Sequence, residues 1–181
     1  MSAPQLPLVS VAIPLFQSRR FFDGIIGNIV AIDYPHLEVI ISDRHCADDT
    51  IELLAERFAS DRRIRCLKGS DRLNWVEHFN LLLRIASGRY FMWMAHDDYY
   101  PSDYVSQLVS CLENRPDVVL AYGRLEAVHL DDRPIGWSAV QRYQDGVIHD
   151  VISGAQRLNR PDSAAAFTAS LKPCPDTIIR R

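Results

Sequence analysis

Short apolar runs alternate with stretches of helical periodicity along most of the chain. Strands are expected at residues 8–14, 37–43, 63–69, 89–95 and 117–128. Between them, apolar side chains recur every three or four residues, which predicts helices at 19–33, 50–60, 73–88 and 102–116. Strands that alternate with helices of this length indicate a mostly parallel sheet with helices on both faces. The pattern therefore predicts an α/β domain.

The pattern becomes weaker after Val128. Residues 129–137 are typical of a turn or a hairpin tip, and 146–152 are consistent with a further strand. After Gly154 the chain is rich in Ala, Ser, Pro and Arg without periodicity, so we expect it to be loosely packed or disordered. These observations divide the chain into residues 1–128 and residues 129–181.

Composition and charge exclude several classes of protein. The chain has 181 residues, of which 48% are hydrophobic and 24% charged, enough for an ordinary globular core. Its net charge is -3 and its Lys and Arg residues are scattered, so no nucleic-acid partner is expected. No apolar run is long enough to cross a membrane, and the first residues do not resemble a secretory signal. Association with a membrane surface stays open.

The number and spacing of the cysteines bear on metal binding and on the cellular compartment. The four cysteines include no pair with the C-x-x-C spacing that is typical of zinc or redox sites. Free thiols are the simplest interpretation, and they are typical of the cytoplasm. We therefore expect a cytoplasmic protein.

Polar residues follow the ends of the first four predicted strands. The first strand leads into Pro14 and Gln17, and the second ends on Asp43 and Arg44. The third is followed by Lys68 and Arg72, and the fourth by His96-Asp97-Asp98. In an open α/β sheet, ligands bind beyond the carboxyl ends of the parallel strands. If the sheet is parallel, these side chains gather at one edge and form a candidate ligand site.

Asp97 and Asp98 stand next to each other directly after an apolar strand. Adjacent carboxylates repel, so keeping both ionised favours a nearby cation. One or two carboxylates, with phosphate oxygens and water, are the usual ligands of magnesium in proteins. A solvated loop or a helix N-terminus would also explain the pair, but its place at the end of a strand favours the metal interpretation.

Other polar residues near these strand ends leave alternatives open. Asp43 could bind a base or a ribose, or it could cap the loop that follows it. Lys68 and Arg72 could contact phosphate groups, but charged residues after a surface strand are usually just solvated, and this simpler interpretation is favoured. A lone histidine such as His96 does not make a metal site.

Three segments together resemble a known family. They are "VSVAIPLFQ", "LEVIISDRHCADDTIELL" and "GRYFMWMAHDDYYPSDYV". Their order and spacing resemble glycosyltransferase family 2, whose members are inverting enzymes of the GT-A fold, a Rossmann-like mostly parallel sheet with helices on both faces. The resemblance extends roughly from Leu8 to Val128. It implies that residues 1–128 form a nucleotide-sugar-binding half and that residues 129–181 form part of an acceptor-side segment.

The resemblance also implies an activity and its cofactor. Members transfer a sugar with inversion from a nucleotide-diphosphate donor, and they depend on a divalent cation, Mn²⁺ or Mg²⁺. The acceptor here could be a glycan, a lipid or a protein. A non-catalytic or truncated nucleotide-sugar-binding module is the alternative. A dinucleotide-binding oxidoreductase is disfavoured, because no G-x-G-x-x-G follows the first strand.

The resemblance assigns roles to individual residues. Pro14 would contact the nucleobase through its backbone, and Asp43 would lie next to that base. Asp97 would lie near the ribose, and Asp98 would bind the metal ion and, through it, the diphosphate. Arg72 occupies a region where some members place a basic contact to the nucleotide.

The sequence departs from the family pattern after the second predicted strand, and it leaves the general base unassigned. Arg44 stands where the family has a second acid that often reads the base, and arginine cannot accept a hydrogen bond from an imide N–H. A preference for uridine is therefore in doubt. The general base that inversion requires cannot be chosen among the downstream acids, which are Asp145, Asp150, Asp162 and Asp176.

Overall fold

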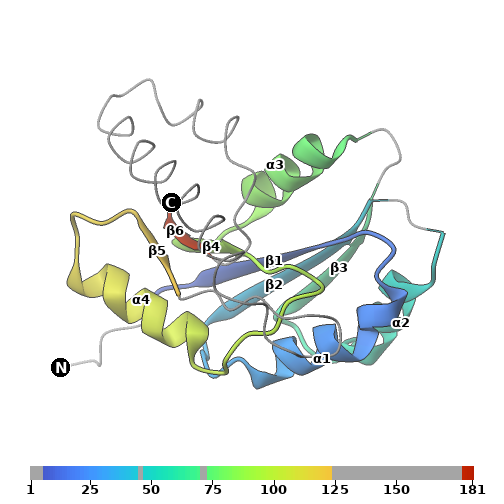
Figure 1. The fold of residues 1–181 in the computed structure, drawn as a ribbon, viewed down its shortest axis with the longest axis horizontal. Helices are drawn as coiled ribbons and strands as arrows, with labels where there is room; N and C mark the ends of the chain where they lie inside the picture. Colours follow the sequence, from blue (N-terminus) through green and yellow to red (C-terminus); the bar gives the residue numbers. More distant parts are fainter. Residues whose placement is uncertain (1–5, 45–46, 70–72, 124–176) are drawn as a thin grey trace, which may run out of the picture. The chain divides into compact units, whose positions relative to one another are not determined.

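A six-stranded sheet of order β3-β2-β1-β4-β6-β5 forms the centre of the computed structural model (Figure 1). The structure describes residues 6–44, 47–69, 73–123 and 177–181, which belong to one compact unit. Strands β1 to β4 are parallel, whereas β6 runs antiparallel to both β4 and β5. The predicted mostly parallel α/β sheet is confirmed. The strands are β1 (Val9–Leu15), β2 (Leu37–Asp43), β3 (Ile64–Lys68), β4 (Tyr90–Trp93), β5 (Leu120–Tyr122) and β6 (Thr177–Arg180).

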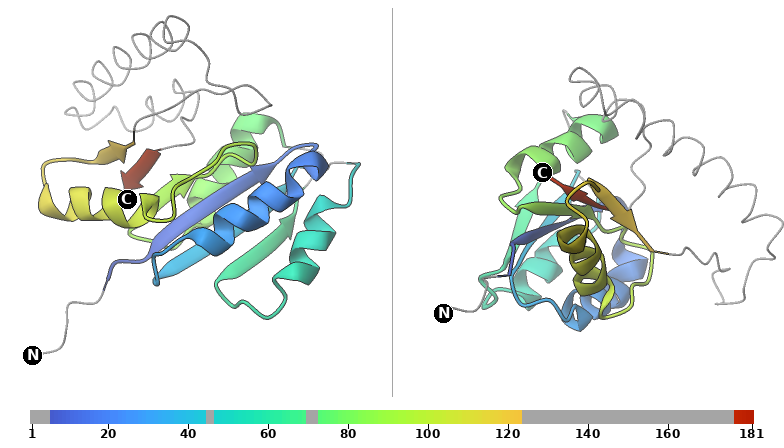
Figure 2. Two further views of the ribbon diagram at one scale, coloured as in Figure 1. Left: turned by 60° about the horizontal axis from the view of Figure 1, so that its bottom comes forward. Right: turned by 90° about the vertical axis from the view of Figure 1, so that its left-hand side faces the viewer.

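Helices cover both faces of this sheet (Figures 1 and 2). One face carries α1 (Phe22–Ala31), α2 (Thr50–Arg57) and α4 (Tyr104–Asn114), and the other carries α3 (Trp75–Ile85). Neighbouring residues of β1 point to opposite faces. Val11 therefore packs in the cluster with α1, α2 and α4, and Ala12 packs in the cluster with α3. All residues of β1 are buried, as expected for a parallel strand that is covered on both sides.

Local hydrogen bonds fix where the helices begin. Asn74 and Glu77 form a capping box at the start of α3, in which the Glu77 N–H donates to Asn74 Oδ1 (3.0 Å) and the Asn74 N–H donates to Glu77 Oε2 (2.8 Å). Asp48 Oδ1 accepts from the Thr50 N–H (3.2 Å) at the start of α2. Ser18 lies directly before Arg19, but its side chain makes no capping hydrogen bond to the helix, and its hydroxyl accepts from the Phe16 N–H instead (3.0 Å). A short 3-10 turn, η1 (Arg19–Phe21), therefore precedes α1.

Strand β6 differs from the expectation for the end of the sequence. Thr177–Arg180 pairs with β4 on one side and β5 on the other, and Ile178 is fully buried between them. This part of the expected loosely packed or disordered segment is therefore ordered. A strand of four residues is too short to show periodicity, and its pairing partners are distant in the sequence. The other features predicted after Gly123 lie outside the described residues.

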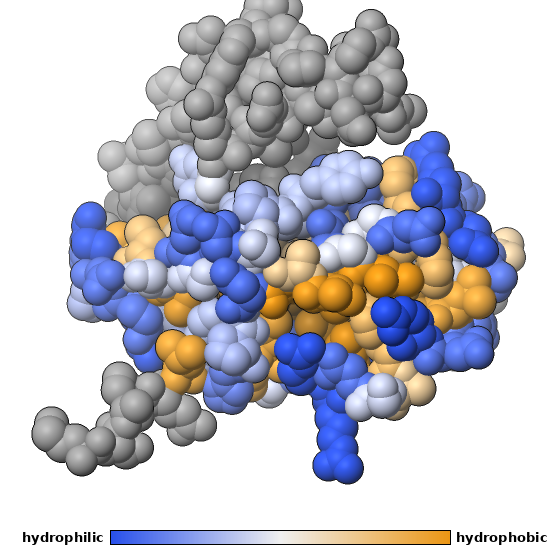
Figure 3. All heavy atoms as spheres, turned by 90° about the horizontal axis from the view of Figure 1, so that it is seen from below, coloured by the Kyte–Doolittle hydropathy of each residue, from blue (hydrophilic) through white to orange (hydrophobic). Residues whose placement is uncertain are grey.

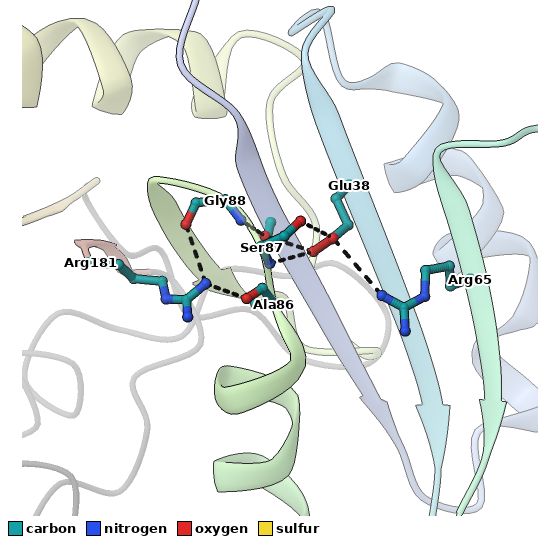
Figure 4. Close-up of polar contacts among 7 residues, drawn as sticks. Glu38, Arg65, Ala86, Ser87, Gly88 and Arg181 are labelled. Carbon is teal, nitrogen blue, oxygen red and sulfur yellow. Dashed lines mark hydrogen bonds and ion pairs between the residues drawn. The ribbon is translucent and has the colours of Figure 1, made fainter.

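A polar network joins β1, β2 and the α3–β4 loop at the amino ends of the strands (Figure 4). Glu38 accepts hydrogen bonds from the Ser10 hydroxyl (2.9 Å) and from the Ser87 N–H (3.0 Å) and hydroxyl. The Gly88 N–H donates to the Ser10 hydroxyl oxygen (2.8 Å). A Cβ on Gly88 would lie 2.6 Å from Ser10 N, so this close approach of two backbones requires glycine.

Arg181 extends the same network from the end of β6. Its N–H donates to the Arg89 carbonyl (2.9 Å), and its guanidinium donates to the carbonyls of Ala86 and Gly88 (Figure 4). These contacts tie β6 to the loop that leads into β4. They lie at the amino ends of the parallel strands, opposite to their carboxyl ends.

The Glu38 network leads to a prediction about acid stability. Burial alone would raise the pKa of Glu38, but hydrogen bonds from Ser87 and Ser10 and the charge of Arg65 (4.0 Å) together lower this pKa. A lowered pKa contributes stability above the unfolded-state value of about 4.3, and that stability is lost as pH falls through the folded-state pKa. At pH 7, Glu38→Gln is expected to lower the free energy of unfolding by about 1.5–3 kcal/mol, the usual worth of hydrogen bonds to a charged group.

Urea denaturation at pH 7 and near pH 3 measures this difference. The gap in unfolding free energy between wild type and Glu38→Gln should narrow at the lower pH, because protonation of Glu38 in the folded state progressively removes the charge that strengthens its hydrogen bonds. Glu56→Gln, on the exposed side of α2, serves as the control and should change the unfolding free energy little at either pH. A difference in unfolding free energy of equal size at both pH values would contradict the assigned role of the Glu38 charge.

The surface over α1, α2 and α4 mixes hydrophilic residues with hydrophobic ones (Figure 3). Val30 of α1 is the most exposed large aliphatic residue among the described part of the chain, at 64%. Within the described ranges, no helix has the length and apolar character needed to pass through a bilayer.

Candidate functional site

The carboxyl ends of β1 to β4 meet at one edge of the sheet, which we call the carboxyl edge. In the strand register, Leu15 lies opposite Asp43, Asp43 lies opposite Lys68, and Ala12 lies opposite Trp93. The loops that leave these strands therefore begin side by side (Figure 2). This is the edge at which ligands bind in open α/β sheets.

The loop after β4 reaches across to the end of β1. His96 Nδ1 lies 3.4 Å from the Pro14 carbonyl oxygen, and the His96 ring packs against Phe21 with 5.2 Å between ring centroids. The Met94 N–H donates to the Ala12 carbonyl (2.8 Å), which continues the parallel pairing beyond the last residue of β4. The acidic pair that follows His96 is thus held near Pro14.

Asn28 of α1 fixes the backbone of the acidic loop from the other side. Its Nδ2 donates to the Asp98 carbonyl (2.7 Å), and its Oδ1 accepts from the Tyr100 N–H (3.3 Å). Asn28 is buried, with 6% of its surface exposed. The Tyr100 hydroxyl in turn accepts from the Ala95 N–H (3.1 Å), which closes the loop on itself. These hydrogen bonds hold the backbone of Asp98 in one position relative to β1 and α1.

The two acids of this loop differ in exposure. Asp97 is exposed and lies in a turn, whereas Asp98 is partly buried. A carboxylate on a fixed backbone at the mouth of the sheet can bind a cation that also contacts a bound ligand. Among the described residues, no group of three or more His, Cys, Asp or Glu side chains could hold a metal ion by itself. One or two carboxylates with phosphate oxygens and water are a usual ligand set of magnesium in proteins, and Asp98 could supply one of these carboxylates.

The end of β2 contributes a buried acid and a basic side chain. Asp43 is buried, with 6% of its surface exposed. The backbone leaving β3 passes so closely that a Cβ on Gly69 would lie 1.8 Å from the Asp43 carbonyl oxygen, so glycine is required there. The guanidinium of Arg44 lies over the ring of Phe16, 5.4 Å from its centroid. Lys68, by contrast, forms an exposed ion pair with Glu52.

A buried histidine lies beneath this corner. His78 of α3 is 2% exposed, and its Nε2 lies 2.8 Å from the Ser42 hydroxyl oxygen. Burial lowers the pKa of His78, the charge of Arg44 lowers it further, and Asp43 opposes both. The imidazole is therefore neutral at pH 7, and it links α3 to the end of β2.

The loops after β1 and β2 are tied to each other. The Arg19 N–H donates to Asp48 Oδ2 (3.3 Å), and Arg19 Nε lies 3.1 Å from Asp49 Oδ1. Gln17 has a positive φ of 50°, which produces a tight turn directly after Phe16. The turn leaves the Phe16 ring 52% exposed at the carboxyl edge.

Most of the site residues predicted from the sequence lie at the carboxyl edge. Pro14, Asp43 and Arg44 belong to neighbouring strand ends, and contacts through His96 and Asn28 position the loop of Asp97 and Asp98 beside them. Arg72 and the four candidate general bases lie outside the described residues. Asn28 and His78 were not predicted as site residues.

Comparison of the sequence with protein families identifies the family to which most of the chain is similar. Residues 10–154 match the family described as "Glycosyl transferase family 2". An uncharacterized glycosyltransferase of Haemophilus influenzae is 28% identical over 122 residues, which are 67% of this chain and 38% of that protein. The UDP-Glc:alpha-D-GlcNAc-diphosphoundecaprenol beta-1,3-glucosyltransferase WfaP of Escherichia coli is 27% identical over 108 residues, which are 60% of this chain and 42% of that protein.

Solved structures show the same fold. Mannosyltransferase PcManGT from Pyrobaculum calidifontis, in complex with GDP-Man and Mn²⁺, superimposes with a TM-score of 0.58 at 23% identity, over 65% of this chain and 35% of that one. S. aureus TarS 1-349 in complex with UDP-GlcNAc has a TM-score of 0.59 at 16% identity, over 71% of this chain and 36% of that one. The chain thus spans less than half the length of these relatives.

Proposed function

Since this chain belongs to glycosyl transferase family 2, we propose that its carboxyl edge binds a nucleoside-diphosphate sugar together with a divalent cation. The sugar is transferred with inversion to an acceptor, which is a glycan, a lipid or a protein. Residues 1–128 form the donor-binding half, and residues 129–181 form part of the acceptor side. The complexes of PcManGT with GDP-Man and Mn²⁺ and of TarS with UDP-GlcNAc support a donor and a cation of these kinds.

The observation that carries the proposal is the position of the acidic loop. His96 contacts the Pro14 carbonyl, and Asn28 fixes the backbone at Asp98. The two acids therefore stand at the strand ends where an open α/β sheet binds its ligand. Asp98 holds the Mn²⁺ or Mg²⁺ ion, and Asp97 lies beside the ribose.

The remaining residues bind the nucleoside. The backbone at Pro14 contacts the base, Asp43 lies next to that base, and Arg72 adds a basic contact to the nucleotide. A bound divalent ion supplies positive charge that stabilises the diphosphate as it leaves. A general base from residues 129–181 takes the proton of the acceptor hydroxyl. Cys66 and Cys111 are free thiols, which agrees with the cytoplasmic location that we propose.

Calorimetric titration of the full chain tests the proposal. GDP-, UDP- and dTDP-sugars are titrated with and without Mn²⁺, and NAD is titrated as the ligand of the disfavoured oxidoreductase class. At least one nucleotide sugar is expected to bind only when Mn²⁺ is present, because the ion joins Asp98 to the diphosphate. Binding of NAD without metal, and of no nucleotide sugar, would contradict the proposal.

Turnover is measured separately from binding. Slow hydrolysis of the donor, or transfer to a panel of glycan, lipid and peptide acceptors, is expected from an active transferase. Tight and metal-dependent donor binding with no turnover on any acceptor would instead identify a non-catalytic binding module.

A further inference from the structure

Phe16, which is exposed, and Arg44, which is partly buried, form a cation–aromatic pair at the carboxyl edge. Phe16 follows the last residue of β1, and Arg44 follows the last residue of β2. These strands are neighbours in register, so the two side chains leave the sheet at the same point, and the Arg44 guanidinium lies 5.4 Å from the centroid of the Phe16 ring. An accessible aromatic ring beside a guanidinium fork offers a stacking surface and several hydrogen-bond donors.

Arg44 has no acidic partner among the residues that the structure describes. Arg44 forms no ion pair with a carboxylate in the part of the chain that the structure describes, although several other surface arginines do. His78, whose pKa the charge of Arg44 lowers, is neutral, and its Nε2 lies 2.8 Å from the Ser42 hydroxyl oxygen. Among the described residues, the guanidinium is therefore held over an aromatic ring with no carboxylate paired to its planar set of N–H groups.

The chemistry of arginine restricts which base edge it can read. A guanidinium donates and never accepts, and its paired N–H groups match two neighbouring acceptors. Guanine presents O6 and N7 in this way. Cytosine presents O2 and N3, whereas uracil and thymine place an N–H donor between their two carbonyl oxygens. The paired N–H groups of the guanidinium therefore find no two neighbouring acceptors on this edge of uracil or thymine.

We propose that Arg44 sets the nucleobase preference of the site and selects a base with two adjacent acceptors, guanine or cytosine, over uracil and thymine. The inference rests on the proposed nucleotide-sugar function of the carboxyl edge. Phe16 carries the flat face of the base, and the Arg44 fork reads its acceptor edge.

Titration of GDP, CDP, UDP and dTDP in the presence of Mn²⁺ tests the preference. GDP or CDP is expected to bind at least about tenfold more tightly than UDP and dTDP, which is the discrimination that a bidentate arginine contact commonly gives. The comparison between GDP and CDP distinguishes the two possible bases. Equal or tighter binding of UDP or dTDP by the wild-type chain would overturn the inference and leave the proposed function standing.

The variant Arg44→Asp replaces donors by acceptors at this position. It is expected to remove or reverse the preference for GDP or CDP. Arg57→Asp is the matched control, because Arg57 also lies over an aromatic ring, that of Phe58 (5.6 Å), but at the far end of α2. This control should keep the wild-type preference, with urea denaturation confirming that both variants are folded.

Two further outcomes would count against the inference. A loss in Arg44→Asp by the same factor for all four nucleotides would show that Arg44 contacts the shared ribose or diphosphate, and not the base. Failure of all four nucleotides to bind the wild-type chain would overturn the proposed function itself, and the inference with it.

Discussion

Replacing Asp98 by alanine is expected to abolish the Mn²⁺-dependent part of nucleoside-diphosphate binding. Asp98 is the partly buried acid of a loop whose backbone is fixed by Asn28. We expect binding in the presence of Mn²⁺ to weaken by roughly 100-fold, or about 2.8 kcal/mol at 1.4 kcal/mol per factor of ten. Calorimetry of the nucleotide and the electron paramagnetic resonance signal of free Mn²⁺ measure this loss.

Asp117→Ala is the control for this experiment. Asp117 is an exposed carboxylate that pairs with Arg115 (3.0 Å) after the end of α4, away from the carboxyl edge. Exposed ion pairs contribute little to stability, so this variant should fold and bind like the wild type. If Asp98→Ala binds Mn²⁺ and nucleotide as tightly as Asp117→Ala, Asp98 is not the metal ligand.

Replacing Asn28 by alanine is expected to affect both stability and metal binding. The change leaves the Asp98 carbonyl and the Tyr100 N–H without their buried partner, which should lower the free energy of unfolding by about 2–3 kcal/mol. It also frees the backbone at Asp98, so the affinity for Mn²⁺ in the presence of nucleotide should fall by about tenfold. Urea denaturation measures the first effect, and Mn²⁺ titration at a temperature where the variant is fully folded measures the second.

The two measurements, unfolding free energy and Mn²⁺ affinity, separate a positioning role of Asn28 from a purely structural one. Asn114→Ala, at the exposed end of α4, removes an asparagine with only a long hydrogen bond to Ser110 (3.4 Å) and should change neither quantity. Asn28→Asp keeps the acceptor for the Tyr100 N–H but loses the donor to Asp98, so its Mn²⁺ affinity should also fall. Loss of stability with unchanged metal affinity in both Asn28 variants would show that Asn28 only supports the fold.

Strong local patterns made much of the sheet predictable from the sequence. Leu37–Asp43 is an apolar run that ends on an acid, and β2 has the predicted bounds. Of the strand predicted at 117–128, residues 117–123 are described, and β5 covers Leu120–Tyr122 of these. Strand β6 was missed because its four residues gain their stability only from pairing with distant strands.

The site was predictable where topology alone determines position. Parallel strands bring their carboxyl ends together, so Asp43 and the acids after β4 could be placed at one edge without coordinates. Asn28 and His78 act through contacts with residues far away in the sequence, which local patterns do not reveal. A signal was present in both cases, because each is a polar residue within the buried stripe of its helix, beside Ile29 in α1 and four residues before Leu82 in α3.

The location of a bound metal ion and nucleotide tests the central claim most directly. Crystals of the chain grown with Mn²⁺ and GDP can be measured at the manganese absorption edge, so that the ion is identified by its anomalous signal. We predict an Mn²⁺ peak between the Asp98 carboxylate and the diphosphate oxygens, with the base lying over the ends of β1 and β2 near Pro14 and Asp43. An ion or nucleotide bound elsewhere, with the Asp98 side chain turned away from it, would contradict this claim.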